Sequence, residues 1–277
     1  MRMSDSQLSH AIDRGVHLTP AGDDRFAGHA QAEWQNMVGP FGGITAAAAL
    51  NGVLQHPKLL GEPIALTVNF AAAIAEGPFE VRAVPVRTNR STQHWNVEIH
   101  QEGSDGPLTT ASVVTAARRE TWSTDDEPMP RAPAPDTIVV PPYTPPVAWV
   151  NNYEIKPVSG TLPTAWDGSD GESSYSLMWM RDRPARTLDF VSMAAISDLF
   201  FPRIWRRRAT RVPAGTVSIT TYFHAGSEQM AEVGTQWLLG QAKAHTFRNG
   251  FFDQTGQIWS QSGHLLVTTH QIVYYKE

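Results

Sequence analysis

The segment VGPFGGITAAAALNGVL, residues 38–54, decides the fold class. Its apolar part, Ile44–Leu54, holds four consecutive alanines followed by larger aliphatic residues, which predicts a buried helix. Four segments rich in β-branched and aromatic residues follow, bounded by turn residues. We expect them to be strands over residues 64–73, 79–86, 93–101 and 108–116. A helix followed by a run of antiparallel strands indicates an α+β module.

The same order of elements recurs in the second half of the chain. We expect a helix over Leu188–Trp205 and strands over residues 216–224, 235–246, 250–253 and 258–273, with a turn at 253–256. Asn69-Phe70 matches Tyr222-Phe223, and a turn at Gly106 matches the turn at Gly256, both at an offset of about 150 residues. The sequence therefore predicts two α+β modules in tandem.

A proline-rich segment separates these halves. Eight prolines and four acidic residues lie between Glu120 and Val147, a density that excludes a helix or a central strand. Such a segment is typical of an extended, semi-rigid linker. We expect an N-terminal module over residues 1–119, a linker over 120–147 and a C-terminal module over 148–277.

Composition narrows the class of protein. The 277 residues include no cysteine, which excludes disulfides, thiolate metal sites and a cysteine nucleophile. The net charge of −5 disfavours a protein that coats nucleic acid. Residues 1–6 show no secretory signal, and the stretch from Trp34 up to Lys58, which holds no charged residue before Lys58, is interrupted by glycine, proline and polar residues, so it is no membrane span. We expect a soluble cytoplasmic protein.

Four positions are candidates for chemistry, and each has an ordinary alternative. Gly42 and Gly43 open the first helix, where free N–H groups suit an oxyanion, although glycine also permits tight packing. Asp198 stands in an apolar helix and would be a good base if buried, or simply exposed at the helix edge. Thr216 suits holding a water against Asp198, or belongs to the polar outer face of its strand. His264 suits orienting water, or is a half-exposed strand histidine.

A basic run follows the second helix and contains Arg203, Arg206, Arg207, Arg208 and Arg211. Arginine forks suit phosphate groups, and a solvated loop is the alternative. The sequence holds no dinucleotide-binding, Walker or nucleophile-elbow motif, and its histidines lack metal-site spacing. We expect no cofactor and no metal.

Taken together, these residues resemble the TesB-type (type II) acyl-CoA thioesterases, across nearly the whole chain. The resemblance rests on the order of several short motifs: Phe41-Gly42-Gly43, Thr67-Val68-Asn69-Phe70, Thr88-Asn89-Arg90-Ser91, Ser197-Asp198-Leu199 and Tyr222-Phe223-His224. It implies a double hot-dog fold, in which each of two long helices is wrapped by an antiparallel sheet.

The resemblance also implies a set of site residues. The family's catalytic Asp and Thr fall on Asp198 and Thr216, and its Gln falls on His264, which either replaces the amide or leaves that role to Gln261. Gly42 and Gly43 would bind the oxyanion. Substrate binding would fall to Arg90, Ser91, Arg206 and Arg207.

The implied activity is hydrolysis of fatty acyl-CoA to fatty acid and CoA by an Asp-activated water, within lipid metabolism. The alternative is a non-catalytic acyl-CoA or acyl-chain binding protein on the same fold, which the departure at His264 favours. A hot-dog hydratase or dehydratase ranks last, since its sequence patterns are missing. The expected partners are acyl-CoA and a second copy of the chain in a homodimer or larger homo-oligomer, with no nucleic acid and no membrane segment.

Overall fold

The computed structural model describes residues 10–141 and 144–277. The N-terminal residues considered for a signal and Pro142 of the proline-rich segment therefore lie outside the described residues. In the first half, a short helix α1 (Ala11–Gly15) precedes the long helix α2 (Gly42–Leu54). The strands of this half are β1 (Thr19–Gly22), β2 (Arg25–Ala30), β3 (Glu62–Phe70), β4 (Gly77–Thr88), β5 (Thr92–His100) and β6 (Thr109–Ala116).

The second half contains three α-helices among the described residues, α3 (Phe190–Ile196), α4 (Arg203–Arg208) and α5 (Ser227–Val233). Its strands are β7 (Tyr153–Ser159), β8 (Ser176–Asp182), β9 (Ala214–Phe223), β10 (Leu238–Lys243), β11 (Phe247–Arg248), β12 (Phe251–Ser260) and β13 (Leu265–Tyr275). Short 3-10 turns lie at Ala32–Trp34, Pro135–Thr137 and Ala148–Asn152.

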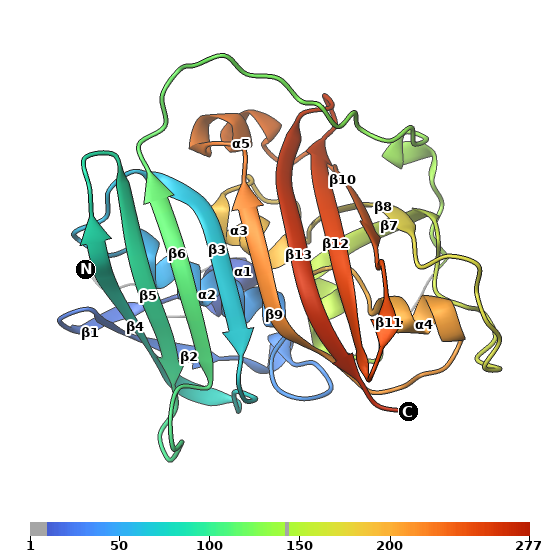
Figure 1. Cartoon of the computed structure of the whole chain (residues 1–277), viewed down its shortest axis with the longest axis horizontal. Helices are drawn as coiled ribbons and strands as arrows, with labels where there is room; N and C mark the ends of the chain where they lie inside the picture. Colours follow the sequence, from blue (N-terminus) through green and yellow to red (C-terminus); the bar gives the residue numbers. More distant parts are fainter. Residues whose placement is uncertain (1–9, 142–143) are drawn as a thin grey trace.

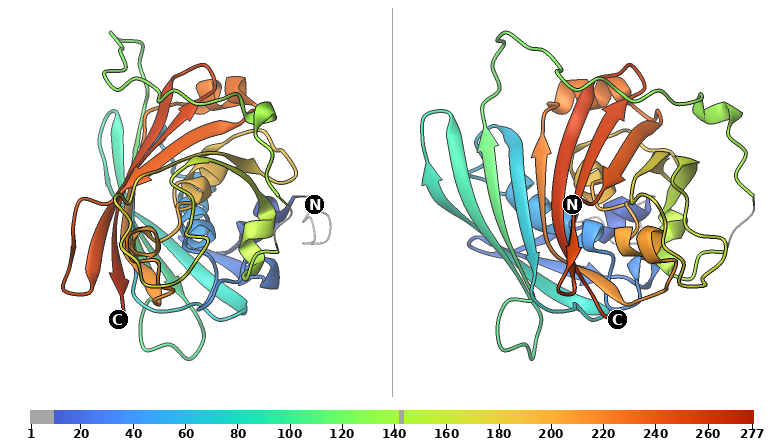
Figure 2. Two further views of the ribbon diagram at one scale, coloured as in Figure 1. Left: turned by 90° about the vertical axis from the view of Figure 1, so that its right-hand side faces the viewer. Right: turned by 45° about the vertical axis from the view of Figure 1, so that its right-hand side comes forward.

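All these strands form one sheet, in the order β1-β2-β4-β5-β6-β3-β9-β13-β12-β10-β8-β7, with β11 paired to β12 (Figure 1). The two halves join where β3 pairs antiparallel with β9, and a hydrogen bond between the Thr67 and Thr220 hydroxyls (2.9 Å) crosses this seam. The sheet curves around α2 and α3, which lie together on its concave face (Figure 2). This arrangement confirms the predicted tandem double hot-dog fold.

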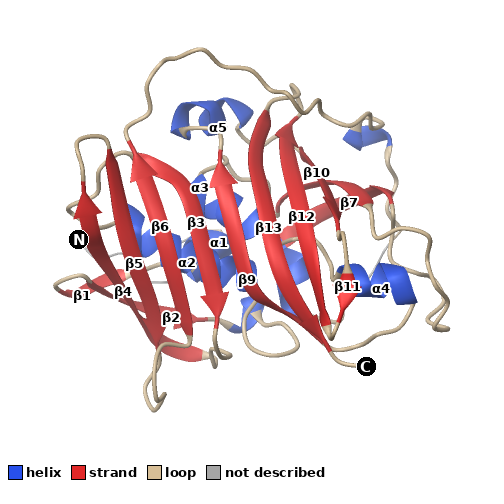
Figure 3. Ribbon diagram, in the orientation of Figure 1, coloured by secondary structure: helices blue, strands red, loops and turns tan. Residues whose placement is uncertain are grey.

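Helix α2 is buried along nearly its whole length because its residues are small and apolar. Its alanines let the helix lie close to both the sheet and α3. Among these contacts, Gly52 faces Val81 of β4, where an added Cβ would lie 2.7 Å from the valine side chain. In the view of Figure 3, α2 and α3 lie behind the central strands of the sheet.

The second predicted helix is wrong in its extent. The chain is helical over α3, leaves the helix after Ile196, and becomes helical again only in α4. Pro202 explains the break, because a proline is accepted at the start of a helix but not within one. Asp198 therefore lies in the turn after α3, outside the helix.

The predicted turn at residues 253–256 is also wrong. These residues lie inside β12, and the turn between β12 and β13 is at Gln261–His264, where Gly263 has a φ of +94°. Gly256 is required by packing instead, because a Cβ there would lie 2.8 Å from the ring of Phe200. A strand glycine that admits a neighbouring ring resembles a turn glycine in sequence alone.

The proline-rich region contains no strand among its described residues. The last strand of the first half ends at Ala116 and β7 begins at Tyr153, and the intervening chain crosses one edge of the molecule (Figure 1). Sequence patterns did not predict the outer strands β1, β2, β7 and β8. No helix in the described part of the chain has both the length and the apolar character to cross a membrane.

Arg203 was grouped with the phosphate-binding candidates, and the structure corrects this. Its side chain is fully buried, and its guanidinium donates to the Ser176 hydroxyl (2.6 Å) and to the carbonyl oxygens of Phe201 and Ser174. Burial lowers the pKa of Arg203 to about 9. The group joins the start of α4 to strand β8.

We predict that Arg203→Ala lowers the free energy of unfolding by about 2–4 kcal/mol, because several buried acceptors would lose their donor. Urea denaturation checks this, with Arg207→Ala on the same helix as the control. The control should change stability by less than about 0.5 kcal/mol. Equal losses for the two variants would contradict a structural role for Arg203.

Candidate functional site

The candidate site lies where the end of α3 meets the beginning of α2. Asp198, two residues after α3, places its Oδ2 atom against Gly42, the first residue of α2. A Cβ on Gly42 would lie 2.7 Å from that oxygen, and a Cβ on Gly43 would collide with the carbonyl oxygen of Ala195. Both glycines are therefore required by the close approach of the two halves.

Two strands supply polar partners to Asp198. Gln271 of β13 donates from Nε2 to Asp198 Oδ1 at 2.9 Å, and Thr216 of β9 donates from Oγ1 to Gln271 Oε1 at 3.1 Å. The threonine thus orients the amide so that its NH₂ group faces the carboxyl. Three side chains from one helix end and two neighbouring strands form a single hydrogen-bonded chain.

A strand irregularity brings Thr216 into this chain. Ser218 pairs with exposed Ile272, whereas Thr216 pairs with buried Val273, so Val217 is an extra residue in β9. Such a bulge reverses the facing of the residues beyond it. Thr216 consequently faces the interior with Gln271, and does not share the outward face of Ser218 as simple alternation predicts.

The surroundings of Asp198 raise its pKa to about 7. Burial is the largest cause, while the hydrogen bond from Gln271 and the backbone N–H of Gly43 oppose it. The residue nevertheless keeps part of its surface accessible to solvent. A carboxyl group that is desolvated, oriented and still reachable has the properties of a general base near neutral pH.

The structure does not bring His264 or Gln261 to this site. Both lie in the turn between β12 and β13, seven or more residues along the chain from Gln271, and the exposed His264 ring lies 3.7 Å from Asp125. Because the turn was predicted too early, His264 was assigned to a strand position that it does not occupy. The missed residue is Gln271. The signal that could have found it is the alternation along β13, where every second residue, Thr269, Gln271 and Val273, is buried.

The four predicted substrate-binding residues fall in two places. Arg206 and Arg207 lie on α4, which packs against β12 at the end of the sheet where Thr216 lies. Arg90 and Ser91 lie in the turn between β4 and β5. The pairing of β5, β6 and β3 places this turn at the opposite end of the sheet from Thr216. The structure therefore brings only the α4 pair toward the end of the sheet that holds Asp198.

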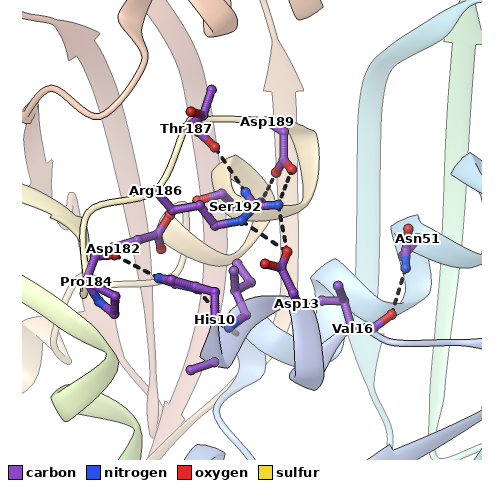
Figure 4. Close-up of polar contacts among 12 residues, drawn as sticks. His10, Asp13, Val16, Asn51, Asp182, Pro184, Arg186, Thr187, Asp189 and Ser192 are labelled. Atoms are coloured by element: carbon purple, nitrogen blue, oxygen red, sulfur yellow. Dashed lines mark hydrogen bonds and ion pairs between the residues drawn. The ribbon is translucent and has the colours of Figure 1, made fainter. Parts of the chain in front are cut away.

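A second polar cluster lies at the opposite ends of the two helices. Arg186 bonds the carboxylates of Asp13 (2.8 Å) and Asp189 (2.6 Å), and Asp189 also caps the N-terminus of α3 (Figure 4). Asn51, near the end of α2, donates to the carbonyl oxygen of Val16. Here the charged groups are paired with one another, whereas the partners of Asp198 are an amide and a backbone N–H.

Within residues 10–141 and 144–277, no group of three or more His, Asp or Glu side chains is placed to hold a metal ion. Asp198 is placed to accept a proton, and Gln271 and Thr216 are placed to keep it oriented. This combination suits the activation of a water molecule.

Comparison with known families finds two matches. The model described as the acyl-CoA thioesterase N-terminal domain matches residues 31–116, and the one described as the acyl-CoA thioesterase C-terminal domain matches residues 123–275. Together they span both halves of the fold and include every member of the Asp198 chain. Comparison with curated proteins gives no match.

Solved structures share the fold over nearly the whole chain. A conserved protein of unknown function with a hot-dog fold from Alicyclobacillus acidocaldarius is 43% identical, with a TM-score of 0.91 over 98% of this chain and 99% of that one. A putative thioesterase II from Thermobifida fusca is 14% identical (TM-score 0.80; 97% and 98% coverage). The acyl-CoA thioesterase II TesB2 from Mycobacterium marinum is 18% identical (TM-score 0.73; 96% and 98% coverage).

We predict that Asp198→Asn stabilises the protein at pH 8 more than at pH 4. The raised pKa of Asp198 means that the folded state penalises the charged form, and this cost grows as pH rises from about 4 to about 7. The asparagine keeps an acceptor for Gln271 and carries no charge. Thermal melts of both proteins at the two pH values check the sign. The exposed change Glu120→Gln serves as control, and a stabilisation independent of pH would contradict the burial of Asp198.

Proposed function

Since the chain belongs to the acyl-CoA thioesterase family, we propose that it hydrolyses acyl-CoA to a free acid and CoA with Asp198 as the general base. The observation that carries this proposal is the hydrogen-bonded chain from Thr216 through Gln271 to Asp198. The pKa of Asp198, about 7, suits proton transfer at neutral pH.

In the proposed reaction, Asp198 removes a proton from a water molecule while the water oxygen attacks the thioester carbonyl carbon. The carbonyl electron pair moves to oxygen and forms an oxyanion. When this intermediate collapses, the carbon–sulfur bond breaks, and the CoA thiolate takes up the proton held by Asp198. Gln271 donates one hydrogen bond to Asp198 throughout and leaves Oδ2 as the basic atom.

The first turn of α2 is the proposed oxyanion site. Its backbone N–H groups lack partners within the helix, and the helix dipole favours negative charge there. Gly43 directs its N–H toward Asp198, so Gly42 is the better placed of the two predicted donors. Arg206 and Arg207 on α4 are the proposed contacts for CoA phosphates, and Arg90 and Ser91 carry no role in this proposal.

A small cavity beside α2 is the proposed start of the acyl path. Its walls include Ile44, Thr45 and Ala48 of α2, with Phe79 and Ile99 of the sheet opposite. The cavity measures ≈ 20 Å³, which is little more than one water molecule occupies.

The binding-protein alternative loses its main support. It depended on a histidine standing in place of the family's glutamine, and Gln271 now provides that amide at Asp198. No observation favours a hydratase. The cytoplasmic location, the role in lipid metabolism and the homo-oligomer stay predictions.

We predict that the wild-type protein releases CoA thiol from acyl-CoA, and that Asp198→Asn lowers kcat/KM at least about 10²-fold. Wild-type kcat/KM should fall about tenfold per pH unit below pH 7, because protonated Asp198 cannot accept a proton. A thiol reagent measures both, and the absence of cysteine removes any protein background. Undiminished turnover by Asp198→Asn would reject this base, and the absence of wild-type turnover across all chain lengths would reject the activity.

Two further variants test whether Gln271, which bonds Asp198 in the structure, or His264, which the sequence resemblance suggested, orients Asp198. We expect Gln271→Ala to lower kcat strongly, since Asp198 loses its orienting donor, and His264→Ala to leave kcat unchanged. Steady-state kinetics on the same acyl-CoA compares them. The opposite ranking would return the role to the turn that contains His264 and Gln261.

A further inference from the structure

Tyr153, the first residue of β7, has a buried hydroxyl group that the fold does not use. The residue is only 4% exposed, and its hydroxyl has no hydrogen-bond partner in the described part of the chain. An unpaired buried hydroxyl costs stability, so such a group calls for an explanation. Tyr175, by comparison, donates its hydroxyl to Gln241 at 3.0 Å.

The Tyr153 ring belongs to an aromatic cluster at the N-terminus of α2. It meets Phe41 and Trp149 edge-on, each at 6.1 Å between ring centroids, and Phe41 stacks on Trp149 at 4.1 Å. The Phe41 ring in turn covers Gly43 so closely that no Cβ would fit there. Tyr153 is thus separated from the glycines of the Asp198 site by one side chain.

Two neighbours of Tyr153 also carry unused donors. Trp149 Nε1 and Gln35 Nε2 are buried without partners, and the Trp149 backbone N–H bonds the carbonyl oxygen of Gln35 (3.4 Å). Tyr153 and Trp149, whose rings are in contact, therefore each carry an unpaired buried donor, and Gln35, whose carbonyl oxygen accepts from the Trp149 backbone, carries another. A cluster of donors is complementary to a ligand that brings a hydrogen-bond acceptor.

The charges around Tyr153 keep it a donor. Burial raises the pKa of the Tyr153 hydroxyl well above its usual value, and the carboxylates of Asp182 and Asp198 raise it further. Asp182 pairs with Tyr153 across β7 and β8 and accepts a hydrogen bond from Ser192 (Figure 4). The phenol is therefore protonated at neutral pH.

From this geometry we propose that the Tyr153 hydroxyl binds the carbonyl oxygen of the acyl thioester and stabilises the oxyanion formed from it. The backbone N–H of Gly43 already bonds Asp198, so it is not free to bind the oxyanion. The unpaired Tyr153 hydroxyl would supply a donor in its place. The inference rests on the proposed thioesterase function. It concerns a specific side chain of the second half, not the backbone of α2.

The test is Tyr153→Phe, which keeps the ring and removes only the hydroxyl, with Tyr175→Phe as the matched control. We expect kcat to fall about 10²-fold with KM little changed, since the bond strengthens as charge develops on oxygen. The rise of kcat/KM near pH 7 should stay in place, because Asp198 is untouched. Tyr175→Phe should behave as the wild type.

A binding measurement makes the result independent of turnover. An acyl-CoA ketone with CH₂ in place of the thioester sulfur keeps the carbonyl oxygen, and the matching S-alkyl CoA thioether lacks it. Calorimetry should show that the wild type prefers the ketone and that Tyr153→Phe loses this preference. Should Tyr153→Phe fold poorly, Trp149→Phe tests the neighbouring donor of the same cluster by the same two measurements.

Three outcomes would overturn the proposal: unchanged kcat in Tyr153→Phe, an unchanged ketone preference, or a shift of the pH limb, which would make Tyr153 a positioning residue for Asp198. If kcat is unchanged and only the stability falls, the hydroxyl serves Asp182 and not the substrate. Failure of the wild type to release thiol rejects the thioesterase proposal itself. In that case the ketone comparison still decides whether Tyr153 binds a carbonyl.

Discussion

The structure depends on the contact between the first turn of α2 and the end of α3. At this point the two halves approach so closely that Gly42 and Gly43 have no room for a side chain, with Asp198 against one glycine and the Ala195 carbonyl against the other. The alanines of α2 extend the same close packing along the helix. One sheet can then enclose both helices, and the seam between β3 and β9 closes the molecule on its other side.

This packing creates the unusual acid of the site. Moving a carboxyl group into the interior disfavours its charged form, and the amide of Gln271 compensates only in part, so the pKa of Asp198 rises to about 7. The fold thereby accepts a local loss of stability at neutral pH. A carboxyl group with this pKa is half ionised near neutral pH, as the proposed general base requires.

The two junctions between α2 and α3 differ in the residues that lie there. Where α3 meets the start of α2, an acid faces two glycines and an amide. At the other ends of the same helices, Arg186 is held between Asp13 and Asp189, and its charge is neutralised by the carboxylates. A tandem fold thus provides two similar junctions between α2 and α3. At one junction the carboxyl group of Asp198 has no cationic partner among its hydrogen bonds, whereas at the other the charged side chains are paired with one another.

The sequence by itself determined the class of fold, the first helix, the beginning of the second helix and most of the central strands. It also singled out Asp198 and the glycine pair as candidates, because hydrophobic periodicity and the order of motifs are local properties. It did not identify Gln271, and it placed Thr216 on the same outward face as Ser218. Gly256 resembles a turn residue until the ring of Phe200 is seen to require it, and the bulge at Val217 turns Thr216 inward only through pairing with β13. Strand register and close approach are set by contacts between distant segments, and only the tertiary structure contains them.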